Sequence, residues 1–167
     1  CGGNHDNWPR WNSLPSNDGL SKLAKDCYYV HRGQGIILDG IKHLFFGGAE
    51  STDRHYRVEG VDWWPEETPS RDQFADFFDR MEAFKPEVVV THDAPLQIGI
   101  WKYNRINSTT ANNLDNVFRL SKHKPAHWMF GHHHIVDEWV IGNTVFYCCG
   151  LHGNYIDSRS MSSTNGI

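Results

Sequence analysis

The segment PEVVVTHDAP, residues 86–95, decides the fold predicted for this chain. Glu87 to Thr91 is a short β-branched run of the kind that is buried within a sheet. Pro86 ends the segment before it, because proline cannot continue a helix. The predicted strand places His92 at its end, where loops that carry binding and catalytic residues begin.

Helix and strand patterns alternate on both sides of this segment. Upstream, apolar residues at helical spacing predict a helix that starts at a Thr68 N-cap with Pro69 first and ends near Phe84. Downstream, a moderate helix near residues 112–122 precedes the strand HWMF, the sequence GHHH and two strands around a Gly142-Asn143 turn. The runs YYV, IIL and HLFF predict further strands, with a hairpin at LDGI. The order predicts an α/β fold with a mixed sheet.

Length and composition limit the organisation of the chain. Its 167 residues fit one domain, which we expect to span residues 1–157, with a flexible tail at 158–167. The net charge of -4 gives no basic field for nucleic acid or an anionic membrane. No apolar run approaches the ~18 residues of a membrane span, so we expect a cytoplasmic protein. The four cysteines lack CxxC spacing and predict reduced, structural thiols.

Three clusters carry groups that bind metals: residues 3–6 (GNHD), 91–95 (THDAP) and 131–134 (GHHH). Imidazole nitrogens with amide or carboxylate oxygens suit Zn, Mn, Fe or Ni, and the lack of a nearby thiolate argues against a structural zinc. On an extended segment His132 and His134 would point inward and His133 away. Each cluster alone also fits a turn or a histidine-rich surface patch.

The order of GNHD, a histidine after an apolar strand and GHxH resembles the calcineurin-like metallophosphoesterases. Residues 43–54 (HLFFGGAESTDR) and 61–67 (VDWWPEE), followed by THDAP, look like the bacterial and phage branch of that family. The resemblance implies a mixed-sheet β-sandwich flanked by helices, in an αββα order. It also implies two divalent metal ions, drawn from Mn, Fe, Zn, Co and Ni.

The resemblance assigns roles to individual residues. Asn4, His92 and His132 match ligands of one metal, and His134 matches a ligand of the other. His5 matches the histidine beside the leaving group, and Asp6 is expected to accept a hydrogen bond from it. Separately, the guanidinium of Arg54 is a candidate contact for substrate phosphate.

The family's D-x-H and G-D-x-x-D motifs normally precede GNHD and do not stand before it in this sequence. We therefore expect a C-terminal portion that lacks the first strands and is inactive alone. The intact enzyme would hydrolyse phosphate mono- or diesters by attack of a metal-bridging hydroxide. A nucleotide or nucleic acid would enter only as a substrate, no membrane partner is expected, and the sequence does not define an oligomeric state. The alternative is a noncatalytic metal-binding or interaction module derived from the same fold.

Overall fold

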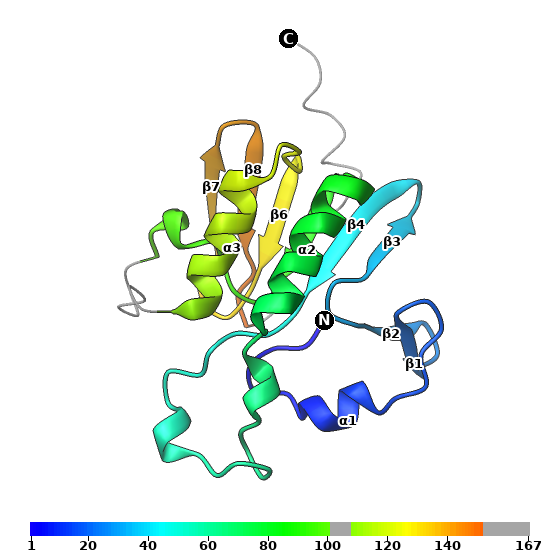
Figure 1. Ribbon diagram of the computed structural model, residues 1–167, viewed down its shortest axis with the longest axis vertical. Helices are drawn as coiled ribbons and strands as arrows, with labels where there is room; N and C mark the ends of the chain where they lie inside the picture. Colours follow the sequence, from blue (N-terminus) through cyan, green and yellow to red (C-terminus); the bar gives the residue numbers. More distant parts are fainter. Residues whose placement is uncertain (101–107, 152–167) are drawn as a thin grey trace.

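The computed structural model describes residues 1–100 and 108–151 of the chain, and six strands there form one mixed sheet (Figure 1). The strand order is β3 (Gly35–Leu38), β4 (Ile41–Phe46), β5 (Val88–Thr91), β6 (His127–Phe130), β8 (Thr144–Cys148) and β7 (Asp137–Ile141). The four central strands are parallel, and the two edge strands pair antiparallel with their neighbours. The α/β class and its mixed sheet are confirmed. The proposed domain boundary at residue 157 and the tail at 158–167 lie outside the described residues.

Helices α2 (Arg71–Phe84) and α3 (Thr109–Leu120) cover one face of the sheet (Figure 1). Their apolar stripes pack onto the alternate strand residues that point the same way, and this layer is the core. Its most deeply buried members include Leu44, Phe46, Phe77, Val89, Trp128 and Phe146.

The start of α2 differs from the sequence prediction, whereas its end at Phe84 agrees. Ser70, not Thr68, is the N-cap: its side chain accepts from the Gln73 N–H, and the Gln73 side chain accepts from the Ser70 N–H. This capping box satisfies two groups at once, which outweighs the preference for proline at the first helical position.

The hairpin predicted at LDGI is confirmed. Leu38 pairs with Ile41, and both turn residues have positive φ, 51° for Asp39 and 83° for Gly40. Such a turn matches the right-handed twist of the flanking strands.

The opposite face of the sheet presents a row of side chains in register: Phe45, Val90, Met129 and Tyr147. These residues are only partly buried. The remaining strands within residues 1–100 and 108–151, β1 (Leu20–Ala24) and β2 (Cys27–Val30), pair only with each other. The described residues therefore contain one six-stranded sheet and a separate two-stranded hairpin, because β1 and β2 pair with each other and not with the edges of the larger sheet.

Short elements complete the structure: α1 (Trp8–Asn12), η1 (Arg54–Tyr56), η2 (Pro65–Glu67) and η3 (Leu96–Ile98). The Arg32 side chain contacts two of these elements, α1 and η2. Its guanidinium donates to the carbonyls of Gly47, Glu66 and Glu67 and stacks on the Trp8 ring at 4.0 Å. Burial lowers the pKa of Arg32 to about 10.

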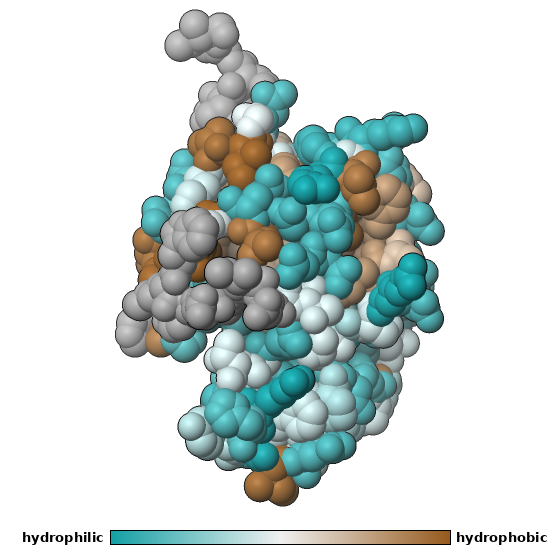
Figure 2. All heavy atoms as spheres, turned by 60° about the vertical axis from the view of Figure 1, so that its left-hand side comes forward, coloured by the Kyte–Doolittle hydropathy of each residue, from teal (hydrophilic) through white to brown (hydrophobic). Residues whose placement is uncertain are grey.

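Hydrophobic patches are interspersed with hydrophilic ones over the upper half of the face in Figure 2, and the lower half is mostly hydrophilic or neutral. Within the part of the chain that the structure describes, no helix has the length and apolar character to cross a membrane.

Candidate metal and phosphoester site

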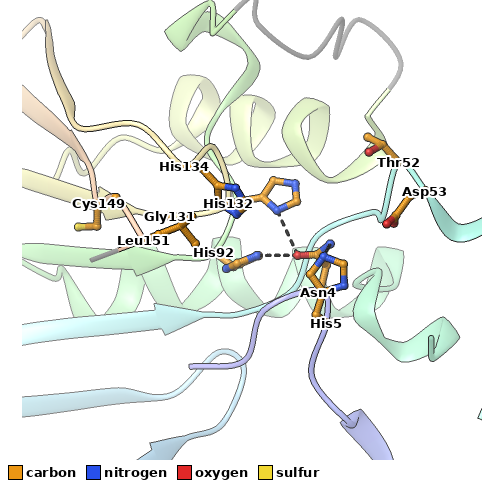
Figure 3. A pocket seen from close by; sticks show the side chains of 11 residues that line it. Asn4, His5, Thr52, Asp53, His92, Gly131, His132, His134, Cys149 and Leu151 are labelled. Carbon is orange, nitrogen blue, oxygen red and sulfur yellow. Dashed lines mark hydrogen bonds between the residues drawn. The ribbon is translucent and has the colours of Figure 1, made fainter. Parts of the chain in front are cut away.

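The carboxyl ends of the parallel strands form one side of a pocket of about 440 Å³ (Figure 3). The strand ladder continues past the strand ends: the His92 N–H donates to the Phe46 carbonyl, and the Gly131 N–H donates to the His92 carbonyl. These bonds place the segments after β5 and β6 side by side. Ligands commonly bind at this edge of an α/β sheet. The lining residues are Asn4, His5, Thr52, Asp53, His92, Gly131, His132, His134, Cys149, Gly150 and Leu151.

Three predicted ligands meet at the side-chain oxygen of Asn4. The Oδ1 atom lies 2.9 Å from Nε2 of His92 and 3.1 Å from Nδ1 of His132. Figure 3 shows both rings directed at this oxygen. The three residues come from the N-terminal loop and from the ends of two adjacent strands, so the sheet brings together groups up to 128 positions apart in sequence.

The N-terminal loop packs against the segment that follows β4, and glycines on both sides form this contact. The Gly48 N–H donates to the Gly2 carbonyl, and a Cβ on Gly47 would lie 2.5 Å from the same oxygen. Side chains at Gly47 are therefore excluded, because the loop packs directly against the backbone that follows β4. This close approach positions Asn4, which is buried.

The side-chain amide of Asn4 has partners on both atoms. Its nitrogen donates to Ser51 Oγ at 2.9 Å and lies 3.4 Å from Nε2 of His5, while its oxygen faces His92 and His132. An amide has two N–H donors and two lone pairs, so this arrangement uses its full capacity and fixes its orientation.

The prediction that His132 and His134 point inward assumed that the sequence GHHH is extended. In the structure this sequence is not extended. Strand β6 ends at Phe130, and His132 and His134 both have positive φ, 65° and 55°. Both line the pocket, as predicted, but through a turn and not through strand alternation. Left-handed backbone favours glycine, so its occurrence at two histidines of one short segment is uncommon.

His133, which the sequence analysis did not include among the ligands, lies in the interior and does not line the pocket. Its exposed fraction is 1%, and Nε2 lies 3.3 Å from Oδ1 of the buried Asp93. This pair anchors the turn between β6 and β7 to the loop after β5.

His5 and Asp6 are placed differently from each other. His5 lines the pocket and is exposed. The Asp6 carboxylate accepts from the Gly3 N–H at 2.5 Å, and no bond from His5 to Asp6 occurs among the described residues. The expected His5–Asp6 hydrogen bond is thus wrong here, because the carboxylate instead closes the tight turn of residues 3–6.

Arg54, the predicted phosphate contact, is exposed in η1 and does not line the pocket. Its neighbours Thr52 and Asp53 do. Both oxygens of Asp53 accept from the Arg57 guanidinium, at 2.9 and 2.6 Å, and this hydrogen bonding lowers the pKa of Asp53. Asp53 was not among the site residues predicted from the sequence, since the irregular loop after β4 gives no periodic signal.

The thiol side chain of Cys149 also lines the pocket, directly after β8. The sequence inference that no thiolate lies nearby considered only neighbours along the chain and therefore did not include this thiol. Burial raises the pKa of Cys149. The position of Cys149 directly after the last parallel strand was the sequence signal that could have identified it as a pocket residue.

Within residues 1–100 and 108–151, no group of three or more His, Cys, Asp or Glu side chains is positioned to hold a metal ion. The Asn4 oxygen nevertheless completes a set of three donors with His92 and His132. Two ligands bonded to one ion at about 2.1 Å and about 90° apart lie roughly 3 Å from each other. The separations of 2.9 and 3.1 Å are ordinary hydrogen-bond lengths, and they are also compatible with a shared divalent ion.

Comparison of the sequence with protein-family models and with curated proteins gives no match. The class that the fold defines is a mixed α/β protein with a cluster of imidazole and amide groups at the carboxyl edge of its parallel strands.

Proposed function

We propose that this chain carries part of the site of a metal-dependent phosphoesterase of the calcineurin-like type, which hydrolyses phosphate mono- or diesters. The observation that supports this most directly is the convergence of His92 and His132 on the Asn4 oxygen. It occurs at the edge of the sheet where the sequence order of the three motifs predicts it. The proposed fold is an αββα sandwich, in which a second sheet packs against the face that carries Phe45, Val90, Met129 and Tyr147.

Asn4, His92 and His132 would hold one ion, and His134 would contribute to a second; both would come from Mn, Fe, Zn, Co or Ni. A divalent ion in such a site supplies Lewis acidity toward a phosphoryl oxygen and lowers the pKa of water. The chain's own part is to orient the substrate and to move a proton. His5, exposed on the pocket wall, is the candidate group to donate a proton to the departing alkoxide.

The described pocket offers few ligands to the second ion. Among its lining residues Asp53 is the sole carboxylate, and it is bound to Arg57. A bridging carboxylate would have to come from elsewhere, which is why we expect little hydrolysis from this chain alone. The same shortage favours the alternative, a noncatalytic metal-binding module of the same fold.

The decisive experiment measures metal binding and hydrolysis separately. Mn²⁺ binding is followed by the loss of the free Mn²⁺ paramagnetic resonance signal, in the 167-residue chain and in a form extended upstream of Cys1. Hydrolysis of p-nitrophenyl phosphate and its bis ester is measured on the same samples. His92→Ala removes a ligand, His5→Ala removes the proposed acid, and His55→Ala replaces an exposed histidine of η1 as the control.

The phosphoesterase proposal predicts Mn²⁺ binding that His92→Ala abolishes, and hydrolysis in the extended form that His5→Ala lowers by about 10²- to 10⁴-fold. Binding without hydrolysis in either form would favour the noncatalytic module. Absence of Mn²⁺ binding, or equal Mn²⁺ affinities of the wild type and His92→Ala, would refute both the phosphoesterase and the noncatalytic metal-binding module.

A further inference from the structure

The buried carboxylate of Glu67 is connected to Asn4 by hydrogen bonds through one intervening residue. Its exposed fraction is 1%, and it stands at the end of η2. Its Oε1 accepts from the backbone N–H of Ser51 at 2.6 Å, and its Oε2 accepts from the Ser51 hydroxyl at 2.8 Å. Ser51 is itself buried and accepts from the Asn4 amide nitrogen at 2.9 Å. The chain of contacts runs from Glu67 through Ser51 to the pocket.

We propose that Glu67, acting through Ser51, sets which end of the Asn4 amide faces the pocket, so that Glu67 is a positioning residue of the metal site. This inference rests on the proposed function in so far as it names a metal as the ligand. The orientation of the amide itself is a property of the metal-free protein.

The direction of the hydrogen bonds carries the argument. A serine hydroxyl has one proton, and here that proton is donated to Glu67. The Ser51 oxygen can then only accept from Asn4, and the amide nitrogen is the donor that Asn4 offers. The amide oxygen is consequently turned toward His92 and His132. An amide oxygen is a metal ligand and an amide NH₂ group is not, so this orientation decides whether Asn4 is able to bind an ion.

The protein holds Glu67 in this position by backbone contacts. The Arg32 guanidinium donates to the Glu67 carbonyl at 3.2 Å, and a Cβ on Gly48 would lie 2.2 Å from the same oxygen. Gly48 belongs to the loop that leads from β4 to Ser51. The 3₁₀ turn that carries Glu67 is thus packed against the loop that carries Ser51.

A hydrogen-bond acceptor that only stabilised this loop would not have to be a carboxylate. Burial of a carboxylate costs desolvation free energy. What a carboxylate adds is that it accepts hydrogen bonds and donates none, so it commits the Ser51 proton to one direction. Glutamine at position 67 would keep the size but offer an NH₂ group to Ser51 Oγ. The Ser51 proton would then be released toward Asn4, and the amide could turn over.

The test compares Glu67→Gln with Glu66→Gln, the adjacent exposed glutamate, as a matched control. Two properties are measured: Mn²⁺ affinity, and the nuclear magnetic resonance signals of the Asn4 side-chain NH₂ group in metal-free protein. We expect Glu67→Gln to weaken Mn²⁺ binding about 10- to 100-fold, the usual effect of losing a group that orients a metal ligand. The same variant should lose the nuclear Overhauser contacts between the Asn4 NH₂ protons and Ser51. Glu66→Gln should retain both properties.

An unchanged Mn²⁺ affinity in a folded Glu67→Gln variant, with a lowered melting temperature only, would reduce Glu67 to a brace of the loop and overturn the proposal. If Glu67→Gln does not fold, the nuclear Overhauser contacts of the wild-type protein still test the proposal. Its Asn4 NH₂ protons must contact Ser51, and contacts to the ring proton Hε1 of His92 without any to Ser51 would contradict the inference. A wild-type chain that shows the predicted amide orientation but binds no Mn²⁺ would refute the metal site and leave the Glu67–Ser51–Asn4 arrangement standing.

Discussion

Replacement of Gly3 by alanine tests the proposed site with a single methyl group. A Cβ on Gly3 would lie 2.8 Å from Cε1, 3.1 Å from Nε2 and 3.2 Å from Nδ1 of His92. The best separation of two carbon atoms is about 3.5 Å or more, so the nearest contact is about 0.7 Å too short. The ring of His92 must move away, because the methyl group is fixed to the backbone.

The size of that movement sets the expected loss. Metal–ligand distances tolerate deviations of about 0.2 Å, so a displacement of about 0.7 Å exceeds the tolerance severalfold. It also disturbs the 2.9 Å contact between His92 Nε2 and Asn4 Oδ1. We expect the affinity for Mn²⁺ to fall about 10- to 100-fold, as for other changes that misorient a metal ligand.

Gly131→Ala is the matched control, since it adds the same methyl group to a residue of the same pocket. The nearest atoms to a Cβ there are the carbonyl oxygens of Cys149 and His92, both at 4.0 Å. We expect at most about a threefold change, because such a contact is ordinary. Titration with Mn²⁺, followed by paramagnetic resonance or calorimetry, measures both variants. Equal affinities of the wild type and Gly3→Ala would refute the assignment of His92 as a ligand.

Two further predictions concern stability and pH. Phe77→Ala should lower the free energy of unfolding by about 3–5 kcal/mol in chemical denaturation, because Phe77 is fully buried and stacks on Phe46 at 4.4 Å. The control Leu120→Ala, 64% exposed at the end of α3, should change it by less than about 0.5 kcal/mol, and similar losses for both would contradict the described core. Burial raises the pKa of Cys148 to about 11 from its usual 9.0, so the stability that this thiol contributes is present below pH 9 and is lost as the pH rises through 11. Iodoacetamide at pH 8.5 should therefore modify the exposed Cys27 rapidly and Cys148 only after unfolding, and equal rates by mass spectrometry would show the second thiol to be accessible.

Much of the fold could be predicted from local sequence signals. The β-branched run at residues 88–91 is β5, the stretch HWMF is β6, and the Asp39-Gly40 pair makes the expected hairpin turn. These signals are local, because the preference for a strand or a tight turn is a property of a few adjacent residues. The N-cap of α2 was misplaced by two residues, since Thr68 and Ser70 both have capping chemistry and only the Ser70–Gln73 pair satisfies two groups.

The sequence by itself also predicted that His92 and His132 lie at one edge of the sheet. His92 and His132 follow the ends of parallel strands, and such ends lie on one edge of a sheet whatever the details of packing. Their residue types and strand positions made them candidate metal-binding groups, and the resemblance to a known family assigned them as ligands.

Only the tertiary structure decided how these groups are oriented. The amide of Asn4 takes its direction from Ser51 and Glu67, which are 47 and 63 positions away in sequence, and the turn of His132 and His134 takes its form from positive φ angles. Cys149 and Asp53 reach the pocket through loops without periodicity. Orientation depends on hydrogen bonds between segments that are distant along the chain, and such bonds form only when packing has brought those segments together.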